Sequence, residues 1–167
     1  MEAELKNKSD NYIQLNEDDV LRLRIRDKEG NDTGNYLEFD LEDIELPLKY
    51  QETLEKHKKN IAYYNNQIKI IDKKQDHKGR KLLSHNEEEK IKASMEFFRK
   101  EVEVYNMFLG ENGVQKLLNG RKLGWGTLAE IDEIIQRDII PQLDVCKEKI
   151  KAKIMNKYSP KRDDVIE

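Results

Sequence analysis

Two segments near the start of the chain alternate apolar and charged residues. In VLRLRIR (20–26) the apolar residues Leu21, Leu23 and Ile25 fall on one face and three arginines on the other, and YLEFDL (36–41) repeats the alternation. This period of two is typical of half-buried strands, and the acids of the second segment complement the arginines of the first. The intervening DKEGNDTGN is rich in turn-forming residues, so we predict an antiparallel hairpin.

The sequence around this predicted hairpin allows two further interpretations. Ile13 and Leu15 alternate in NYIQLN and predict a short additional edge strand. The arginine stripe admits either a phosphate-binding strip or a solvated face that is paired with its acidic neighbours. Glu38 and Asp40 fall on the same predicted face, which favours the paired surface.

Three longer segments repeat apolar residues at the period of one helix face, about 3.6 residues. The first stripe comprises Leu46, Tyr50, Leu54, His57, Ile61, Tyr64, Ile68 and Ile71. The second comprises Ile91, Met95, Phe98, Val102, Tyr105 and Leu109, and Phe97, Val104 and Phe108 widen it. The third comprises Leu128, Ile131, Ile135, Ile139, Leu143, Cys146, Ile150 and Ile154. The width of the second stripe indicates burial against more than one neighbour.

Several residues signal where these helices begin or bend. Pro47 is tolerated in a first turn, and the acids before it favour a helix start. Ser84 with Glu87, and Thr127 with Glu130, have the spacing of capping boxes. Pro141 interrupts the third stripe and predicts a kink, because its ring displaces the carbonyl four residues earlier.

The segment 110–127, GENGVQKLLNGRKLGWGT, contains five of the eight glycines of the chain. GWGTLA satisfies the dinucleotide pattern G-x-G-x-x-G/A, but no strand precedes it, and no Gly-Lys-Ser/Thr ending is present for a Walker loop. The glycines instead suit helix ends: Gly110 stops the second helix and Gly120 stops a short helix in VQKLLN. We therefore predict that these glycines end helices and form the turns between them, and that the segment binds no nucleotide.

Together these patterns predict a mainly α protein of the α+β class. An N-terminal antiparallel β-hairpin should precede a bundle of three long helices and one short helix. The expected divisions are a hairpin region at 1–41, a helical bundle at 42–158 and a flexible tail at 159–167, all within one folded unit.

Composition narrows the classes of partner. The 167 residues carry 31 Lys and Arg against 34 Asp and Glu, a net charge of −3, which does not favour nucleic acid or an anionic membrane. The single cysteine, Cys146, forms no internal disulfide, and no apolar run approaches the length of a membrane span. With a start that lacks a signal-peptide pattern, these features indicate a reducing, cytoplasmic compartment.

Motifs for catalysis, cofactor binding or metal binding are not recognisable in the sequence. HExxH, CxxC and G-x-S-x-G are all missing, so we predict no enzyme, no cofactor and no metal site. His57 lies on a helix stripe with no second ligand three or four residues away, which favours a packed, hydrogen-bonded histidine over a metal ligand.

Trp125, the only tryptophan, stands between two glycines and has two open interpretations. It either plugs a helix junction or anchors an interface, where tryptophan is enriched. The repeated turns around it predict a partner-binding end of the bundle that comprises Phe108, Leu117, Leu118, Leu123 and Trp125. Long stripes in a chain that is only 37% hydrophobic also predict a homo-oligomer.

Two stretches resemble a known family. YLEFDLEDIELPLKYQETLEKHKKNI and FFRKEVEVYNMFLGENGVQKLLNGRKLGWGTLAEIDEII are similar to proteins from the tail-gene clusters of phages and prophages of Gram-positive bacteria, which are regarded as similar to tail assembly chaperones. The resemblance covers about residues 37–150. It implies a non-catalytic protein in the bacterial host cytoplasm that binds helical segments of the tape measure protein during morphogenesis. The alternative is another phage-encoded structural or regulatory module that binds protein.

Overall fold

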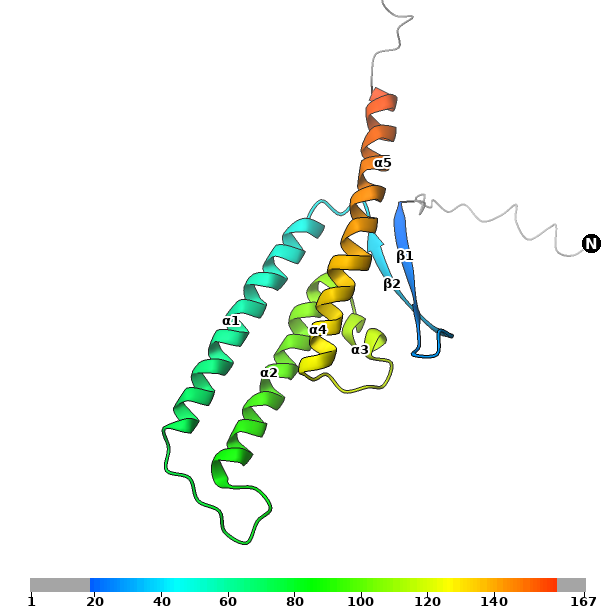
Figure 1. Ribbon diagram of the computed structural model, residues 1–167. Coiled ribbons are helices and arrows are strands. Elements are labelled where there is room, and N and C mark those ends of the chain that lie inside the picture. The colour runs from blue at the N-terminus through cyan, green and yellow to red at the C-terminus, as the bar shows by residue number, and fades with distance from the viewer. Residues whose placement is uncertain (1–18, 159–167) are drawn as a thin grey trace, which may run out of the picture.

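The computed structural model describes residues 19–158 and has the expected architecture (Figure 1). A two-stranded antiparallel hairpin is followed by helices, and the described part of the chain is 64% helical, with three long helices and one short one. The predicted fold class is confirmed. The edge strand predicted at Ile13 and Leu15 and the tail predicted at 159–167 lie outside the described residues.

The hairpin consists of β1 (Val20–Arg26) and β2 (Asp32–Asp40), with Leu23 opposite Leu37 in the register. The turn is shorter than predicted, because Asp27 closes it within five residues by accepting hydrogen bonds from the Glu29 and Asn31 amides at 3.0 and 2.8 Å. The segment DTGN, which was predicted as turn, therefore belongs to β2.

The outer face of the hairpin is paired, as the sequence indicated. Arg22 lies 3.4 Å from Glu38, and Arg24 lies 3.0 Å from Asp32. Each pair is exposed, so each contributes at most about 1 kcal/mol to stability. The apolar residues of the inner face pack against the helices.

Two long helices, α1 (Leu46–Asp72) and α2 (His85–Leu109), run antiparallel side by side (Figure 1). Pro47 lies in the first turn of α1, as predicted. The capping box that begins α2 is also confirmed: Ser84 Oγ accepts from the Glu87 amide at 3.1 Å, and the Glu87 side chain accepts from the Ser84 amide at 2.8 Å.

A tight junction joins α2 to the short helix α3 (Gly113–Leu118). Gly110 ends α2 with a φ of 90°, in a region that favours glycine. Gly113 is required for a different reason, since a Cβ there would lie 2.5 Å from the Leu109 Cβ. The close approach of α3 to α2 thus depends on glycine.

The third long helix is a continuous rod in three parts, α4 (Trp125–Ile134), a π-helical turn η1 (Ile135–Ile139) and α5 (Ile140–Tyr158) (Figure 1). The capping box predicted at Thr127 and Glu130 is wrong. Gly124 is the N-cap, and Thr127, three residues into the helix, accepts a hydrogen bond from the Gly124 amide at 2.7 Å. Trp125 is therefore the first helical residue.

The irregularity predicted at Pro141 lies one turn earlier. Proline has no amide hydrogen, so a regular α-helix would leave the carbonyl of Arg137 without its partner. The structure widens this turn instead: the Ile140 amide donates to the Ile135 carbonyl, and the Gln142 side chain donates to the Asp138 carbonyl at 2.7 Å.

The hydrophobic core lies where the sheet, α2, α3 and the α4–η1 rod meet. Its fully buried large side chains are Phe39, Tyr105, Leu109, Val114, Ile135 and Ile139. Among the helices that the structure describes, none combines the length and hydropathy of a membrane span.

Candidate protein-binding surface

The five residues predicted to bind a partner do not form one surface. Phe108 and Leu118 are buried in the core, and Leu117 and Leu123 are partly buried against it. Only Trp125 is substantially accessible, with 50% of its surface exposed. The structure thus brings the first four residues into the core and its margin and leaves Trp125 as the member that can contact a partner directly.

Trp125 is packed on one side and open on the other. Its ring stacks on Phe97 at a centroid distance of 4.9 Å and an interplanar angle of 23°. Phe98 meets it edge-on at 4.9 Å, and Tyr64 lies 5.3 Å away. The two sequence interpretations therefore each describe part of the side chain, which closes a helix junction while it presents a face to solvent.

The position of Trp125 also marks where the third helix begins. The α4–η1–α5 rod covers α2 from Trp125 towards the sheet (Figure 1). In the other direction α1 and α2 continue to their connecting loop, and we call residues 65–72 of α1 and 85–96 of α2 the loop end of the α1–α2 pair. No third helix of the described residues runs beside the loop end (Figure 1).

Apolar residues continue along α2 beyond the start of α4. Ile91 and Met95 precede Phe98 by seven and three residues, so they lie on the same helix face. Ile91 is 47% exposed and Met95 is 67% exposed. We call Ile91, Met95, Phe98 and Trp125 the open stripe, because they extend the face that α4 covers nearer the sheet.

Charged residues beside the open stripe are balanced. Lys92 pairs with Glu88 at 3.3 Å, and Arg99 pairs with Glu103 at 3.7 Å, both at the i,i+4 spacing of α2. Such a mixed rim does not select a strongly acidic or strongly basic partner. The stripe is suited to an amphipathic segment with apolar residues at helical spacing.

A buried polar cluster lies nearer the sheet and ties the helices together. Glu101 is 0% exposed, and its carboxylate lies 2.5 Å from His57 Nδ1 and accepts from Asn60 Nδ2 at 3.0 Å. The prediction of a packed, hydrogen-bonded His57 is confirmed. Glu101 could not be predicted as its partner, because nothing in a helix stripe marks one buried acid among exposed ones.

A second buried polar contact joins α2 to α4. The Tyr105 hydroxyl donates to Asp132, and burial together with this carboxylate raises the pKa of Tyr105 above its ordinary value. The phenol therefore stays neutral and acts as a donor. Both polar contacts connect helices inside the fold, so we interpret them as structural.

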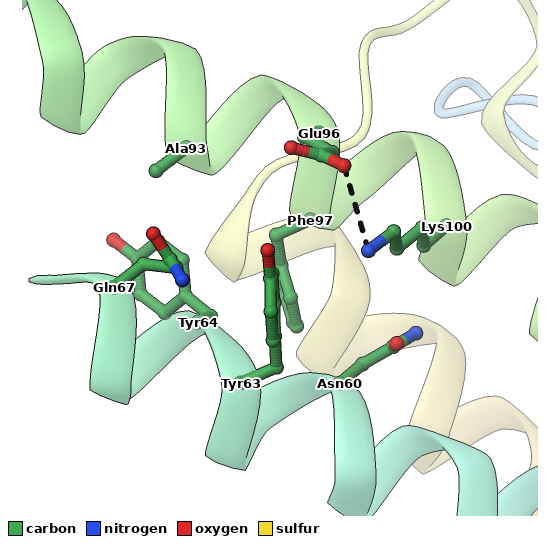
Figure 2. Close-up of a pocket in the computed structure, with 8 residues that line it drawn as sticks. All are labelled: Asn60, Tyr63, Tyr64, Gln67, Ala93, Glu96, Phe97 and Lys100. Atoms are coloured by element: carbon green, nitrogen blue, oxygen red, sulfur yellow. Dashed lines mark ion pairs between the residues drawn. The ribbon is translucent and has the colours of Figure 1, made fainter.

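The small cavity between α1 and α2 is also an unsuitable ligand site. Figure 2 shows it between Tyr63 and Tyr64 of α1 and Phe97 and Lys100 of α2. Its volume is about 50 Å³, whereas small-molecule pockets measure about 300–1,000 Å³. Lys100 lies 4.5 Å from the centre of the Tyr63 ring and 3.5 Å from Glu96, which closes the cavity at its edge.

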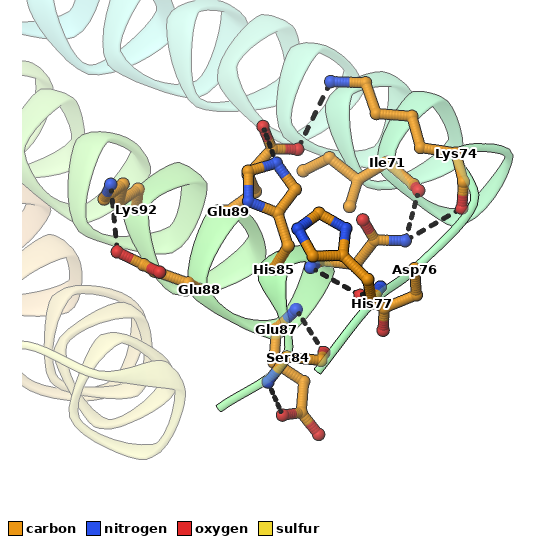
Figure 3. Close-up of polar contacts among 11 residues, drawn as sticks. Ile71, Lys74, Asp76, His77, Ser84, His85, Glu87, Glu88, Glu89 and Lys92 are labelled. Carbon is orange, nitrogen blue, oxygen red and sulfur yellow. Dashed lines mark hydrogen bonds and ion pairs between the residues drawn. The ribbon is translucent and has the colours of Figure 1, made fainter. Parts of the chain in front are cut away.

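The loop that connects α1 and α2 is held by polar contacts (Figure 3). Asn86 donates to the carbonyls of Ile71 and Lys74 at 3.2 and 2.9 Å, which fixes the end of α1 to the start of α2. His77 stacks on His85 with centroids 5.0 Å apart. Within residues 19–158, no three metal-ligating side chains gather there or elsewhere.

Comparison of the chain with protein-family models, with curated proteins and with solved structures finds no match.

Proposed function

We propose that this protein is a non-catalytic helix-binding module, and that its partner helix lies along the open stripe. The observation that carries the proposal is the third helix of the bundle, which begins at Trp125 and leaves the loop end of the α1–α2 pair with two helices. A partner helix there would continue the line of α4. It would cover Ile91, Met95 and the open side of Trp125.

The energetics of such binding are favourable. Full burial of an apolar side chain such as Ile91 or Met95 contributes about 1.5–3 kcal/mol to the free energy of binding. Part of this is offset by the ordering of the partner, because a segment that folds on binding loses conformational freedom. Transient binding is the expected outcome, which suits a chaperone that must release its client.

The resemblance of residues 37–150 to tail assembly chaperones supports a specific partner class. A tape measure protein is long and helical, and it offers repeated amphipathic segments to a surface of this kind. We therefore propose binding to a tape measure protein in the bacterial host cytoplasm during tail morphogenesis. The alternative is another phage structural or regulatory protein that uses the same stripe.

The test is co-expression with the tape measure protein from the same genome, followed by purification of the complex. Met95→Glu should reduce recovery at least about tenfold, because it places a charge in the middle of the bound face. Ile70→Glu is the matched control: Ile70 is 44% exposed and lies about 120° around α1 from Tyr64. Equal recovery of both variants and the parent chain would contradict the proposed surface.

The fluorescence of the single tryptophan provides a second measurement in the same experiment. Because Trp125 is the only tryptophan, its emission reports on the open stripe alone. Binding should shift that emission to shorter wavelength in the parent chain and in Ile70→Glu. Light scattering of the same samples detects self-association, and a dimer that Met95→Glu dissociates would assign the stripe to a second copy.

A further inference from the structure

The β-hairpin has an unpaired edge. Within residues 19–158, β1 has a single neighbouring strand, β2. The Asp19 carbonyl accepts from the Leu41 amide at 2.9 Å, so the odd-numbered residues of this region direct their main-chain groups towards β2. Because the direction alternates along a strand, the amides and carbonyls of Arg22 and Arg24 point away from β2. They form a template for another strand.

A groove of about 450 Å³ borders this edge. Five consecutive residues of β1, Arg22 to Arg26, line it, so the groove follows the edge of the strand and not only one face. Leu37, Leu117 and Ile139 give it an apolar floor, and Arg137, Asp138 and Gln142 line it as well. An occupant with main-chain groups for the edge and apolar side chains for the floor is an extended, alternating segment.

A second copy of β1 fits this edge poorly. Antiparallel pairing of two β1 strands would place the row formed by Arg22, Arg24 and Arg26 beside an identical row on the same face. Like charges directly opposite one another destabilise a sheet. The occupant should instead be neutral on the face that carries the arginines.

We propose that residues 11–16 of this chain, NYIQLN, occupy the edge as a third antiparallel strand. The segment lies outside the described residues and precedes β1 directly in the chain. A three-residue loop at 17–19, a common hairpin length, would place Ile13 opposite Leu23 and Leu15 opposite Leu21. Both apolar side chains then face the groove floor.

The other face of this strand also suits the site. In the same register Tyr12 lies opposite Arg24 and Gln14 opposite Arg22, so neutral side chains meet the arginine row. The chain supplies the segment at high effective concentration, because only the short loop separates it from β1. This inference concerns the opposite end of the molecule from the open stripe and is independent of the proposed function.

Hydrogen exchange of the full-length chain tests the inference. The Arg22 and Arg24 amides should exchange at least about tenfold more slowly than in the double variant Ile13→Asp/Leu15→Asp, which cannot bury its segment. The Leu23 amide faces β2 and should be unchanged, which shows that the hairpin itself stays folded. Lys6→Asp/Lys8→Asp, with the same added acids outside the segment, should behave as the parent chain. Unprotected Arg22 and Arg24 amides in the parent chain would overturn the proposal.

A disulfide distinguishes pairing within one chain from pairing between chains. Opposed hydrogen-bonded residues have Cα atoms about 5.5 Å apart, within the range of a disulfide. In a Cys146→Ser background, Gln14→Cys with Arg22→Cys should oxidise to a monomeric cross-link, and Gln14→Cys with Arg26→Cys should not. Equal cross-linking of both pairs, or a cross-linked dimer, would contradict the assignment to residues 11–16 of the same chain.

Discussion

The two ends of the α1–α2 pair are built from the same amphipathic helices but differ in what covers them. Towards the sheet, Phe108 lies among Phe39 and Tyr50, with ring centroids 5.4 and 5.1 Å away, and α3 and α4 close the core. At the loop end Ile91 and Met95 stay exposed. In the α2 stripe Tyr105 and Leu109 are thus buried while Ile91 and Met95 are exposed, and the difference is the presence of a third helix.

Phe108→Ala should have the largest effect on stability and would test the covered half. A large-to-small change at a buried phenylalanine costs about 3–5 kcal/mol, because it removes apolar contacts and leaves a cavity. Urea denaturation followed by circular dichroism measures this loss. Met95→Ala is the control in the open half and should change the free energy of unfolding by no more than about 0.5 kcal/mol. Similar losses for the two variants would remove the distinction between the ends.

Trp125→Ala should have an intermediate effect, since this residue lies at the boundary between the two halves. Each aromatic contact contributes about 0.5–1.5 kcal/mol beyond area burial, and the exposed side of the ring contributes little. We expect a loss of about 2 kcal/mol in the same denaturation experiment. A loss above about 3 kcal/mol would place the ring in the core, and a loss below about 0.5 kcal/mol would place it wholly on the surface.

Ser84→Ala should have the smallest effect, of about 1 kcal/mol, because it removes one N-cap at the far tip of the loop end. The change should appear first as faster hydrogen exchange in the opening turn of α2, where Ser84 accepts from the Glu87 amide. Ser84→Thr keeps the cap and serves as the control. Unchanged exchange at Glu87 in Ser84→Ala would show that the contacts of Asn86 alone hold this end.

The elements that the sequence predicted well are those decided by local physics. Helical periodicity located α1 and α2, and the spacing of Ser84 and Glu87 located the start of α2, because a cap depends on residues within one turn. The alternation in β1 and β2 predicted their pairing for the same reason. Each signal needs no knowledge of the rest of the fold.

The start of α4 could not be predicted in this way. Threonine satisfies the chemistry of an N-cap and also of the third helical position, so Thr127 fits two registers. In the observed register Gly124 is the N-cap, and Trp125, the first helical residue, contacts Phe97 and Phe98. Those contacts lie far apart in the sequence.

The burial of the predicted partner-binding residues could not be predicted from the sequence for a related reason. The repeated turns between the glycines predicted a partner-binding end of the bundle. The structure brings α3 so close to α2, through Gly113, that Leu118 does reach the core beside Phe108. Only the residue at the start of the next helix, Trp125, stays accessible. Whether it contacts a partner stays a prediction.

The π-helical turn at Ile135–Ile139 changes the direction in which the apolar side chains of the following helix point. Apolar residues four apart drift by about 40° per step around an α-helix, so a long run of such steps would turn away from the core. In a π-helical turn the hydrogen bonds join residues five apart, so the turn contains one residue more than an α-helical turn. The extra residue offsets this drift. Ile139 at its end and Leu143 beyond it thereby remain buried. A one-residue deletion here would restore a regular α-helix yet rotate α5 by about 100°. The extra residue of this turn and the buried face of α5 therefore depend on each other.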